Sequence, residues 1–381
     1  MGKRVFRPGG SFTHLAVLLT VACSNPTSHA EGSRQASEKI VYGTDDRKEF
    51  YEVEDRGLQL TAQAAVAFVL NSSVRPGTDP PFVSPTYGEA SQLCAGVAFE
   101  AQPSAAFCSG VLVDFDLVLT AGHCLRLFPL SQIRIVSHYY YTAPGTLEIQ
   151  ASNVFRVKKI VAEALDPEGG IPRLDFAWVR LDHPVPHSTP VPIFKQPPPL
   201  TAGTPLVAVS APGGIPFKID AGGQVQDPRS QLLDYFVADT DTAHGASGAG
   251  AFSAGGGLVG ILARGGEDFV STPAGCNATN VQPSGGPAGE QFTYAHRAVD
   301  GLCQSDPSAS SLCRADCAEP CAALPAQPST HTDHCAVSSL GSPSPRRGWV
   351  ELFVVAAGFA ARRRGSGSRL PWRQPAACIE A

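Results

Sequence analysis

The stretch from Cys108 to Cys124 limits the possible folds of this chain more than any other. It reads CSGVLVDFDLVLTAGHC, two apolar runs on either side of an Asp-Phe-Asp turn, which predicts a β-hairpin followed by a tight corner. A disulfide between the two cysteines would close this loop and hold His123 still. A positioned imidazole is a candidate general base, although a histidine met singly is more often a core residue. The stretch therefore predicts antiparallel β structure and one candidate catalytic side chain.

A candidate nucleophile lies in a Gly-rich turn further along the chain. Residues 239–252 read DTDTAHGASGAGAF, with Ser247 between Gly245 and Gly248. A serine hydroxyl is a weak nucleophile unless a base and oxyanion donors accompany it. Glycine permits the unusual backbone angles that turn N–H groups toward an acyl oxygen, which makes the N–H groups of Gly245 and Ser247 candidate donors. Taken alone, such a stretch is more simply a small-residue turn.

A carboxylate between these two stretches completes a possible catalytic set. Asp175 stands at the start of the apolar strand predicted over residues 174–181, LDFAWVRL. It could orient His123 and stabilise the cationic imidazole. Each of the three residues has an ordinary interpretation as a core, turn or loop residue. Their order along the chain, His123, Asp175 and Ser247, with the cysteine hairpin and the glycines, matches the chymotrypsin-type arrangement.

The chain resembles the trypsin-like serine peptidases, and within them the bacterial glutamyl endopeptidases. The resemblance covers residues 40–303 and rests on five stretches: IVYGTDDRKEF from residue 40, the hairpin, LDFAWVRLD, VAVSAPGG at 207–214, and DTAHGASGAGAF. It implies a serine-type endopeptidase, a hydrolase, with His123 as base, Asp175 as orienting acid and Ser247 as nucleophile. It also implies an all-β fold of two antiparallel β-barrels with the active site in the cleft between them. No cofactor is expected.

The resemblance also implies a specificity pocket, with one departure. In the glutamyl endopeptidases a threonine five residues before the nucleophile and a histidine fifteen residues after it line the pocket for glutamate. Thr242 matches the first position, but the second is Leu262. An apolar wall disfavours a carboxylate because removing a charge from water without a partner is costly. We therefore expect a preference for small or medium-sized apolar residues, unless Arg264 turns inward and restores an acidic preference.

A second departure concerns activation. Trypsin has an aspartate before its nucleophile that pairs with a newly cut N-terminus, whereas this chain has Ala246. A trypsin-type switch is therefore not expected. Cleavage between Lys39 and Ile40 would leave an ammonium group that needs another partner.

The N-terminal residues predict export. Basic residues precede an apolar core from Leu15 to Ala22, which is typical of a signal peptide and too short for a membrane span. Two cleavage sites compete: the small-x-small sequence ending at Ala30, and an approximate lipoprotein box ending at Cys23. We favour the first. The expected organisation is a signal peptide at 1–30, a short pro-segment at 31–39, and the protease domain at 40–303.

The C-terminal residues change in composition. Residues 304–334 form a Cys, Ser and Pro-rich linker. Residues 335–381 contain Cys335, a short apolar run and the arginine cluster 362–364. They resemble the sorting tails of secreted myxobacterial proteins called MYXO-CTERM, although a frayed amphipathic tail remains the alternative. The tail predicts attachment to the outer envelope of a bacterium, so the protein is expected to be secreted or held at the cell surface.

Cysteine use and charge narrow the possible functions. The chain has eleven cysteines, which favours an oxidising compartment and disulfides. A zinc site formed by Cys313, Cys317 and Cys321 with nearby histidines has poor spacing, and no metal is expected. The net charge of −5 and the lack of a basic cluster in the protease region argue against nucleic acid. The expected partners are protein or peptide substrates.

Two other functions use the same features. One is a catalytically silent protease fold that acts as a surface binding module or adhesin, suggested by Ala246 and Leu262. The other is an esterase, since the acyl chemistry is shared. The complete set of His123, Asp175 and Ser247 favours the peptidase, because a binding module has no physical need for it.

Overall fold

The computed structural model describes residues 41–186, 188–285 and 289–314. The predicted signal peptide, the pro-segment, the linker beyond Arg314 and the sorting tail lie outside these residues. Within the described ranges, no helix combines the length and the apolar character needed to cross a bilayer. The predicted domain boundary at Cys303 falls inside the last helix, and the described fold continues to Arg314.

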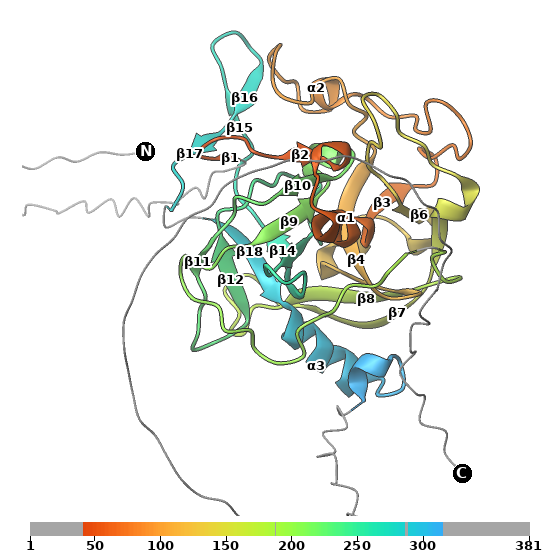
Figure 1. The fold of residues 1–381 in the computed structure, drawn as a ribbon, viewed down its shortest axis with the longest axis vertical. Helices are drawn as coiled ribbons and strands as arrows, with labels where there is room; N and C mark the ends of the chain where they lie inside the picture. The colour runs from red at the N-terminus through yellow and green to blue at the C-terminus, as the bar shows by residue number, and fades with distance from the viewer. Residues whose placement is uncertain (1–40, 187, 286–288, 315–381) are drawn as a thin grey trace, which may run out of the picture. The chain divides into compact units, whose positions relative to one another are not determined.

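The first half of the fold is a closed six-stranded antiparallel barrel (Figure 1). Its strands follow the order β3-β4-β5-β8-β7-β6 around the barrel. Their bounds are β3 Ala65–Leu70, β4 Ala106–Asp114, β5 Leu117–Thr120, β6 Ile133–Ser137, β7 Val154–Leu165 and β8 Asp175–Leu181. The predicted hairpin is therefore confirmed as β4 and β5. Alternating apolar residues at 133–141 and 154–160 also predict strands. The structure has them as β6, which is shorter than predicted, and β7, which is longer.

The second half is an eight-stranded sheet in which every neighbouring pair is antiparallel. Its strand order is β11-β12-β18-β14-β13-β9-β10-β2. The bounds are β2 Lys48–Glu49, β9 Val207–Ser210, β10 Lys218–Asp220, β11 Val225–Asp227, β12 Tyr235–Ala238, β13 Gly250–Phe252, β14 Leu258–Arg264 and β18 Glu290–Tyr294. The Pro-rich residues between β8 and β9 connect the two halves. The all-β fold class is confirmed, and the hydrogen bonding of the second half forms an open sheet.

Two small sheets lie beside the main ones. Strand β1, Val41–Tyr42, pairs in parallel with β17, Val281–Gln282. Strands β15, Phe269–Ser271, and β16, Asn277–Thr279, form a hairpin near the short helix α2, Tyr87–Ala90 (Figure 1). A disulfide between Cys94 and Cys276 ties this hairpin to the segment that follows α2. Short 3₁₀ turns lie at Phe50–Glu52, Gly122–Arg126, Leu130–Gln132, Ala151–Asn153, Pro212–Gly214 and Ser311–Cys313.

One sequence expectation is wrong. The sequence from Leu58 to Leu70, LQLTAQAAVAFVL, predicts a strand followed by buried apolar residues, but its first half belongs to helix α1, Arg56–Gln63. Asp55 caps this helix, because its Oδ1 accepts hydrogen bonds from the N–H groups of Gly57 at 2.7 Å and Leu58 at 3.1 Å. Capping satisfies N–H groups that the first helical turn leaves without partners. Only Ala65–Leu70 form the buried strand β3.

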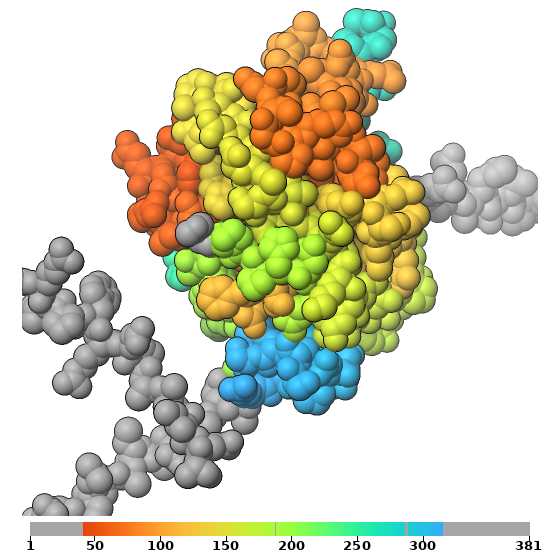
Figure 2. Space-filling view, turned by 90° about the vertical axis from the view of Figure 1, so that its right-hand side faces the viewer, coloured from red at the N-terminus to blue at the C-terminus, as the bar shows by residue number. Residues whose placement is uncertain are grey.

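The last helix, α3, Ala295–Ser305, follows the second sheet but packs against the barrel. Trp178, which is fully buried in β8, donates its indole N–H to the carbonyl oxygen of Ala298 at 2.7 Å. A disulfide joins Cys303 at the end of α3 to Cys313. Figure 2 shows this blue segment against the yellow and green segments of the barrel half. The chain thus returns to its first half, and α3 holds the two halves together.

Candidate active site

His123 and Asp175 come together through the pairing of β5 with β8. Thr120 at the end of β5 lies opposite Ala177, so the corner that follows β5 reaches the start of β8, where Asp175 lies. Oδ2 of Asp175 lies 2.8 Å from Nδ1 of His123, and Oδ1 accepts the backbone N–H of His123 at 3.1 Å. A carboxylate only accepts hydrogen bonds, so Nδ1 carries the proton and Nε2 is the basic nitrogen. The carboxylate is buried, whereas the imidazole side chain is 30% exposed.

Asp175 is also held by the second half of the fold. Its N–H donates to the hydroxyl of Thr293 in β18 at 3.3 Å, and that hydroxyl donates to the carbonyl oxygen of Asp175 at 3.1 Å. The hydroxyl of Thr293 thus bonds both backbone polar groups of the candidate orienting acid.

The turn that carries Ser247 docks directly on the hairpin that precedes His123. The N–H of Ser109 in β4 donates to the carbonyl oxygen of Ser247 at 2.7 Å. Gly248 has a φ of +84°, and a Cβ there would lie 2.1 Å from the carbonyl oxygen of Ser109. Only glycine allows this close approach of two backbones. The structure therefore brings all three candidate residues into one place.

The groups expected to act on a substrate have no hydrogen-bond partner among the described residues. Among the described residues, the N–H groups of Gly245 and Ser247 donate no hydrogen bond, and the hydroxyl of Ser247 makes none. Gly245 takes a φ of +93°, which favours glycine. No hydrogen bond joins the Ser247 hydroxyl to Nε2 of His123 in this part of the chain. Such bonds are often long without substrate and tighten when substrate is bound.

A disulfide between Cys108 and Cys124 lies between the base and the candidate nucleophile. The carbonyl oxygen of Ser247 is 3.7 Å from Sγ of Cys124, and that sulfur is 4.0 Å from Nε2 of His123. These two sulfurs and the imidazole lie close enough to resemble a metal site. Metal binding requires thiolates, however, and the disulfide leaves none.

The zinc site considered for Cys313, Cys317 and Cys321 loses one ligand for the same reason, because a disulfide leaves no thiolate. Cys313 is bonded to Cys303. Cys317, Cys321 and the nearby histidines lie outside the described residues.

The three residues predicted for the specificity pocket lie in different surroundings. Thr242 is fully buried. Leu262 is 3% exposed and belongs to the apolar core of the second half, together with Ala246 and Ala249. Its carbonyl oxygen accepts the N–H of Gly248 at 2.7 Å, so β14 supports the nucleophile turn through its backbone.

Arg264 makes contacts with three neighbours. Its Nε donates to the side chain of Gln291 at 2.9 Å, and Nη2 donates to the carbonyl oxygen of Arg173 at 3.2 Å. The guanidinium also stacks over the ring of Tyr235 at 5.1 Å. These contacts hold the guanidinium of Arg264 beside the segment that leads into β8.

Buried carboxyl groups lie in and beside the loop that precedes Ser247, and they were not identified from the sequence. Asp241 is 3% exposed, and its Oδ1 accepts the N–H of Tyr42 at 2.7 Å, while its own N–H donates to Asp220 at 2.7 Å. Glu290 lies near Thr242 and accepts the hydroxyl of Tyr42 at 3.4 Å. Burial raises the pKa of Glu290 to about 8. Burial, and for Asp220 also the charge of Asp241, raises the pKa values of both aspartates.

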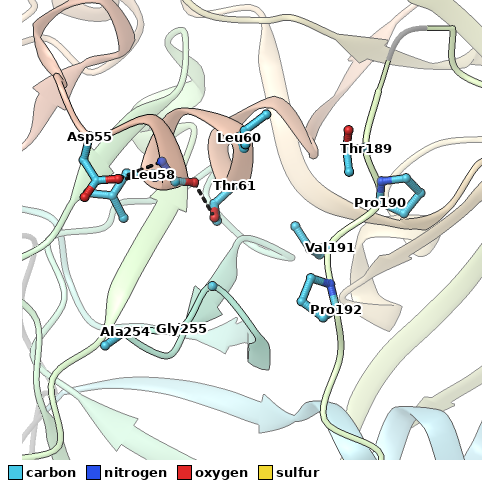
Figure 3. A pocket seen from close by; sticks show the side chains of 12 residues that line it. Asp55, Leu58, Leu60, Thr61, Thr189, Pro190, Val191, Pro192, Ala254 and Gly255 are labelled. Atoms are coloured by element: carbon cyan, nitrogen blue, oxygen red, sulfur yellow. Dashed lines mark hydrogen bonds between the residues drawn. The ribbon is translucent and has the colours of Figure 1, made fainter. Parts of the chain in front are cut away.

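A separate hollow of about 370 Å³ lies away from these residues. It is bounded by α1, residues 189–192 and residues 254–256 (Figure 3). Its polar groups serve the helix: Asp55 is the N-cap, and the hydroxyl of Thr61 donates to the carbonyl oxygen of Gly57 at 3.0 Å. The lining offers no nucleophile with an adjacent base.

Part of the chain matches a known protein family. Residues 108–261 match the model of the trypsin-like peptidase domain. No curated protein sequence matches the chain. The chain is similar in structure to an inactive serine-to-alanine mutant of Rv3671c from Mycobacterium tuberculosis, with 12% identity, 71% of this chain and 98% of that chain covered, and a TM-score of 0.39.

Two further solved structures are similar. The VesB protease of Vibrio cholerae has 16% identity, with 70% of this chain and 67% of that chain covered and a TM-score of 0.40. Human heparin binding protein has 16% identity, with 67% and 95% covered and a TM-score of 0.41.

We predict that the buried Glu290 makes stability fall as pH rises from about 5 to 8. Its folded pKa of about 8 lies above the ordinary value of 4.5. The folded state therefore binds the proton more tightly, and this contribution is complete below pH 4.5 and is lost as pH rises through 8. Glu290→Gln should reduce the fall in the free energy of unfolding between pH 5 and pH 8, by on the order of a few kcal/mol.

Melting temperatures of the native and variant proteins at pH 5 and pH 8 measure this effect. The exposed Glu54, changed to Gln, is the control and should leave the decline unaltered. An equal decline in the Glu290→Gln protein would show that this carboxyl group is not its source.

Proposed function

We propose that the protein is a serine endopeptidase that hydrolyses peptide bonds with Ser247, His123 and Asp175. The observation that carries this proposal is the hydrogen bond between Asp175 and Nδ1 of His123 beside the docked turn of Ser247. The match of residues 108–261 to the trypsin-like peptidase domain supports the same class of reaction. The carboxylate holds the imidazole in the tautomer with its proton on Nδ1, which leaves Nε2 free to act as a base.

In the acylation step, the hydroxyl oxygen of Ser247 attacks the peptide carbonyl carbon while Nε2 of His123 takes its proton. Asp175 stabilises the resulting imidazolium. The N–H groups of Gly245 and Ser247 donate to the oxyanion that forms, and the loss of one such donor typically costs roughly 3 kcal/mol of activation free energy. His123 then gives the proton to the leaving amine, and the peptide bond breaks.

In the deacylation step, a water molecule attacks the acyl-enzyme. His123 takes a proton from this water and returns it to the oxygen of Ser247, which releases the acid product. Each step uses only side chains and N–H groups of this chain, and no cofactor is part of the proposed mechanism.

We propose Thr242, Leu262 and Arg264 as residues of the specificity region, with a preference for small or medium-sized apolar side chains. The buried Glu290 near Thr242 is compatible with this preference. Because its pKa is about 8, its carboxyl group is mostly neutral at pH 7, so it brings little charge to the region.

The first prediction of the proposal concerns the activated serine. The purified, mature protein should react with a fluorophosphonate probe, and Ser247→Ala and His123→Ala should abolish the labelling. Asp175→Asn should lower kcat by about three to four orders of magnitude, because the imidazole loses its orientation. If folded, correctly processed protein does not label, the silent binding module becomes the better hypothesis.

The second prediction concerns the residue before the cleaved bond. Digestion of a peptide library followed by mass spectrometry should show cleavage mainly after small or medium-sized apolar residues, because Leu262 offers no partner to a charge. Dominant cleavage after glutamate would contradict the apolar pocket. Hydrolysis of esters without hydrolysis of peptides would favour the esterase.

The third prediction concerns location. We propose that the signal peptide directs export and that residues 335–381 hold the protease at the cell surface. Three disulfides among the described residues are compatible with an oxidising compartment. Deletion of residues 335–381 should move the protease from the cell-surface fraction to the medium. An unchanged distribution between these fractions would reject the sorting role.

A further inference from the structure

A second pocket begins at Gly245, the candidate oxyanion donor, and none of the predicted specificity residues lines it. We call it the Phe107 pocket. It has a volume of about 390 Å³, within the range of about 300 to 1,000 Å³ that is usual for ligand sites. The residues that matter for its chemistry are Phe107, Phe128, Phe269, His244, Gly245 and Asp268.

The pocket lies on the hairpin side of the candidate nucleophile. Phe107 directly precedes Cys108, whose disulfide with Cys124 lies against the carbonyl oxygen of Ser247. Residues 127 and 128 follow the 3₁₀ turn of His123. Thr242, Leu262 and Arg264, which we propose for the residue before the cleaved bond, are absent from its lining. If a peptide substrate binds across Ser247, the residues after its cleaved bond would therefore lie over the Phe107 pocket.

The walls of the pocket are preformed. The rings of Phe107 and Phe128 pack edge to face with centroids 4.9 Å apart. The opposite wall combines the end of α2 with Phe269 of β15, and the Cys94–Cys276 disulfide ties these two segments together. Pre-organised walls lower the entropic cost of binding.

The floor of the pocket, the turn at residues 213–214, is held by hydrogen bonds. The carbonyl oxygen of Gly213 accepts the hydroxyl of Ser104 at 2.7 Å, and its N–H donates to the carbonyl oxygen of His244 at 2.8 Å. A Cβ at Gly213 would lie 1.9 Å from the ring of Tyr87, so the turn requires glycine at this position. The turn at 213–214 is thereby held against the loop of Gly245.

Asp268 gives this aromatic pocket one negative group. Its Oδ2 accepts the backbone N–H of His244 at 2.7 Å. Burial raises its pKa to about 6, so the carboxylate is still ionised above pH 7. Arg47, which influences Asp268 electrostatically, is already paired with Asp45 through two hydrogen bonds of 2.8 and 2.6 Å. In the described part of the chain, no lysine or arginine forms a salt bridge with Asp268.

We propose that the Phe107 pocket binds a lysine or arginine side chain among the first residues after the cleaved bond. This inference rests on the proposed function. The alkyl stem of the side chain would lie along the aromatic rings while its charged head reaches Asp268. Asp268 is thus a residue that determines specificity on the leaving side, and the proposed preference before the cleaved bond is independent of it.

The test compares digests of one peptide library by the native protein and by Asp268→Asn. Asparagine keeps a carbonyl oxygen that can accept the N–H of His244 but removes the charge. Lysine and arginine should be enriched at one of the first three positions after the cut by about two- to fivefold, the range of a partly exposed ion pair. Asp268→Asn should abolish this enrichment and leave the preference before the cut unchanged.

The matched control is Glu267→Gln, which removes an exposed charge next to Asp268 but outside the pocket lining. It should retain the enrichment. Equal enrichment in the native and Asp268→Asn proteins, or none in the native protein, would overturn the assignment. The absence of any hydrolysis would contradict the proposed function instead.

A binding measurement tests the pocket without turnover. A fluorescent peptide with a free N-terminus and lysine at its second position, which has the form of a leaving product, is titrated against the Ser247→Ala protein. Its affinity should fall about two- to fivefold when Asp268→Asn is added. Equal affinities of the two proteins would contradict the pocket whether or not the native protein hydrolyses peptides.

Discussion

The backbone hydrogen bond from Ser109 to Ser247 is the contact on which the site depends. It joins the first β-hairpin of the barrel to the turn of the second sheet, and the missing side chain of Gly248 lets the two backbones meet. Without it, the His123–Asp175 pair would have no neighbouring hydroxyl. The proposed oxyanion donors depend on the same contact, because Gly245 and Ser247 belong to the docked turn.

The loop that precedes Ser247 is also supported by hydrogen bonds from the N-terminal strand β1. Tyr42, at the beginning of the described fold, donates its N–H to Asp241 and its hydroxyl to Glu290. Burial raises the pKa of Glu290 to about 8 and that of Asp241 to about 7, so near neutral pH the first is mostly neutral and the second is only partly ionised. The N-terminal strand β1 therefore contacts the nucleophile loop through hydrogen bonds. This agrees with Ala246, which offers no carboxylate to an ammonium group.

Local patterns in the sequence were sufficient for the hairpin and for β8. They also indicated His123, Asp175 and Ser247 as catalytic residues, and that role stays a prediction. Short apolar strands and Gly-rich turns are encoded by neighbouring residues. Helix α1 was misread because its only clear signal is the capping residue Asp55, which precedes an apolar run that also suits a strand.

Features that depend on distant partners could not be predicted. The Cys94–Cys276 disulfide joins residues 182 positions apart. Asp241, Glu290 and Asp268 stand in unremarkable loop and strand contexts, and only the folded chain shows which carboxyl groups become buried. The Phe107 pocket is built from six separate segments, so no single stretch of sequence indicates it.

The division of the site between the two halves has a consequence for its failure under stress. His123 and Asp175 both belong to the barrel, whereas Ser247 belongs to the sheet, and α3 holds the halves together through Trp178. A slight separation of the halves would leave the imidazole and its carboxylate paired while the hydroxyl moved out of reach. Under the proposed function, the protein would then lose activity before either half unfolded, because the proposed base would stay in place while the proposed nucleophile was displaced.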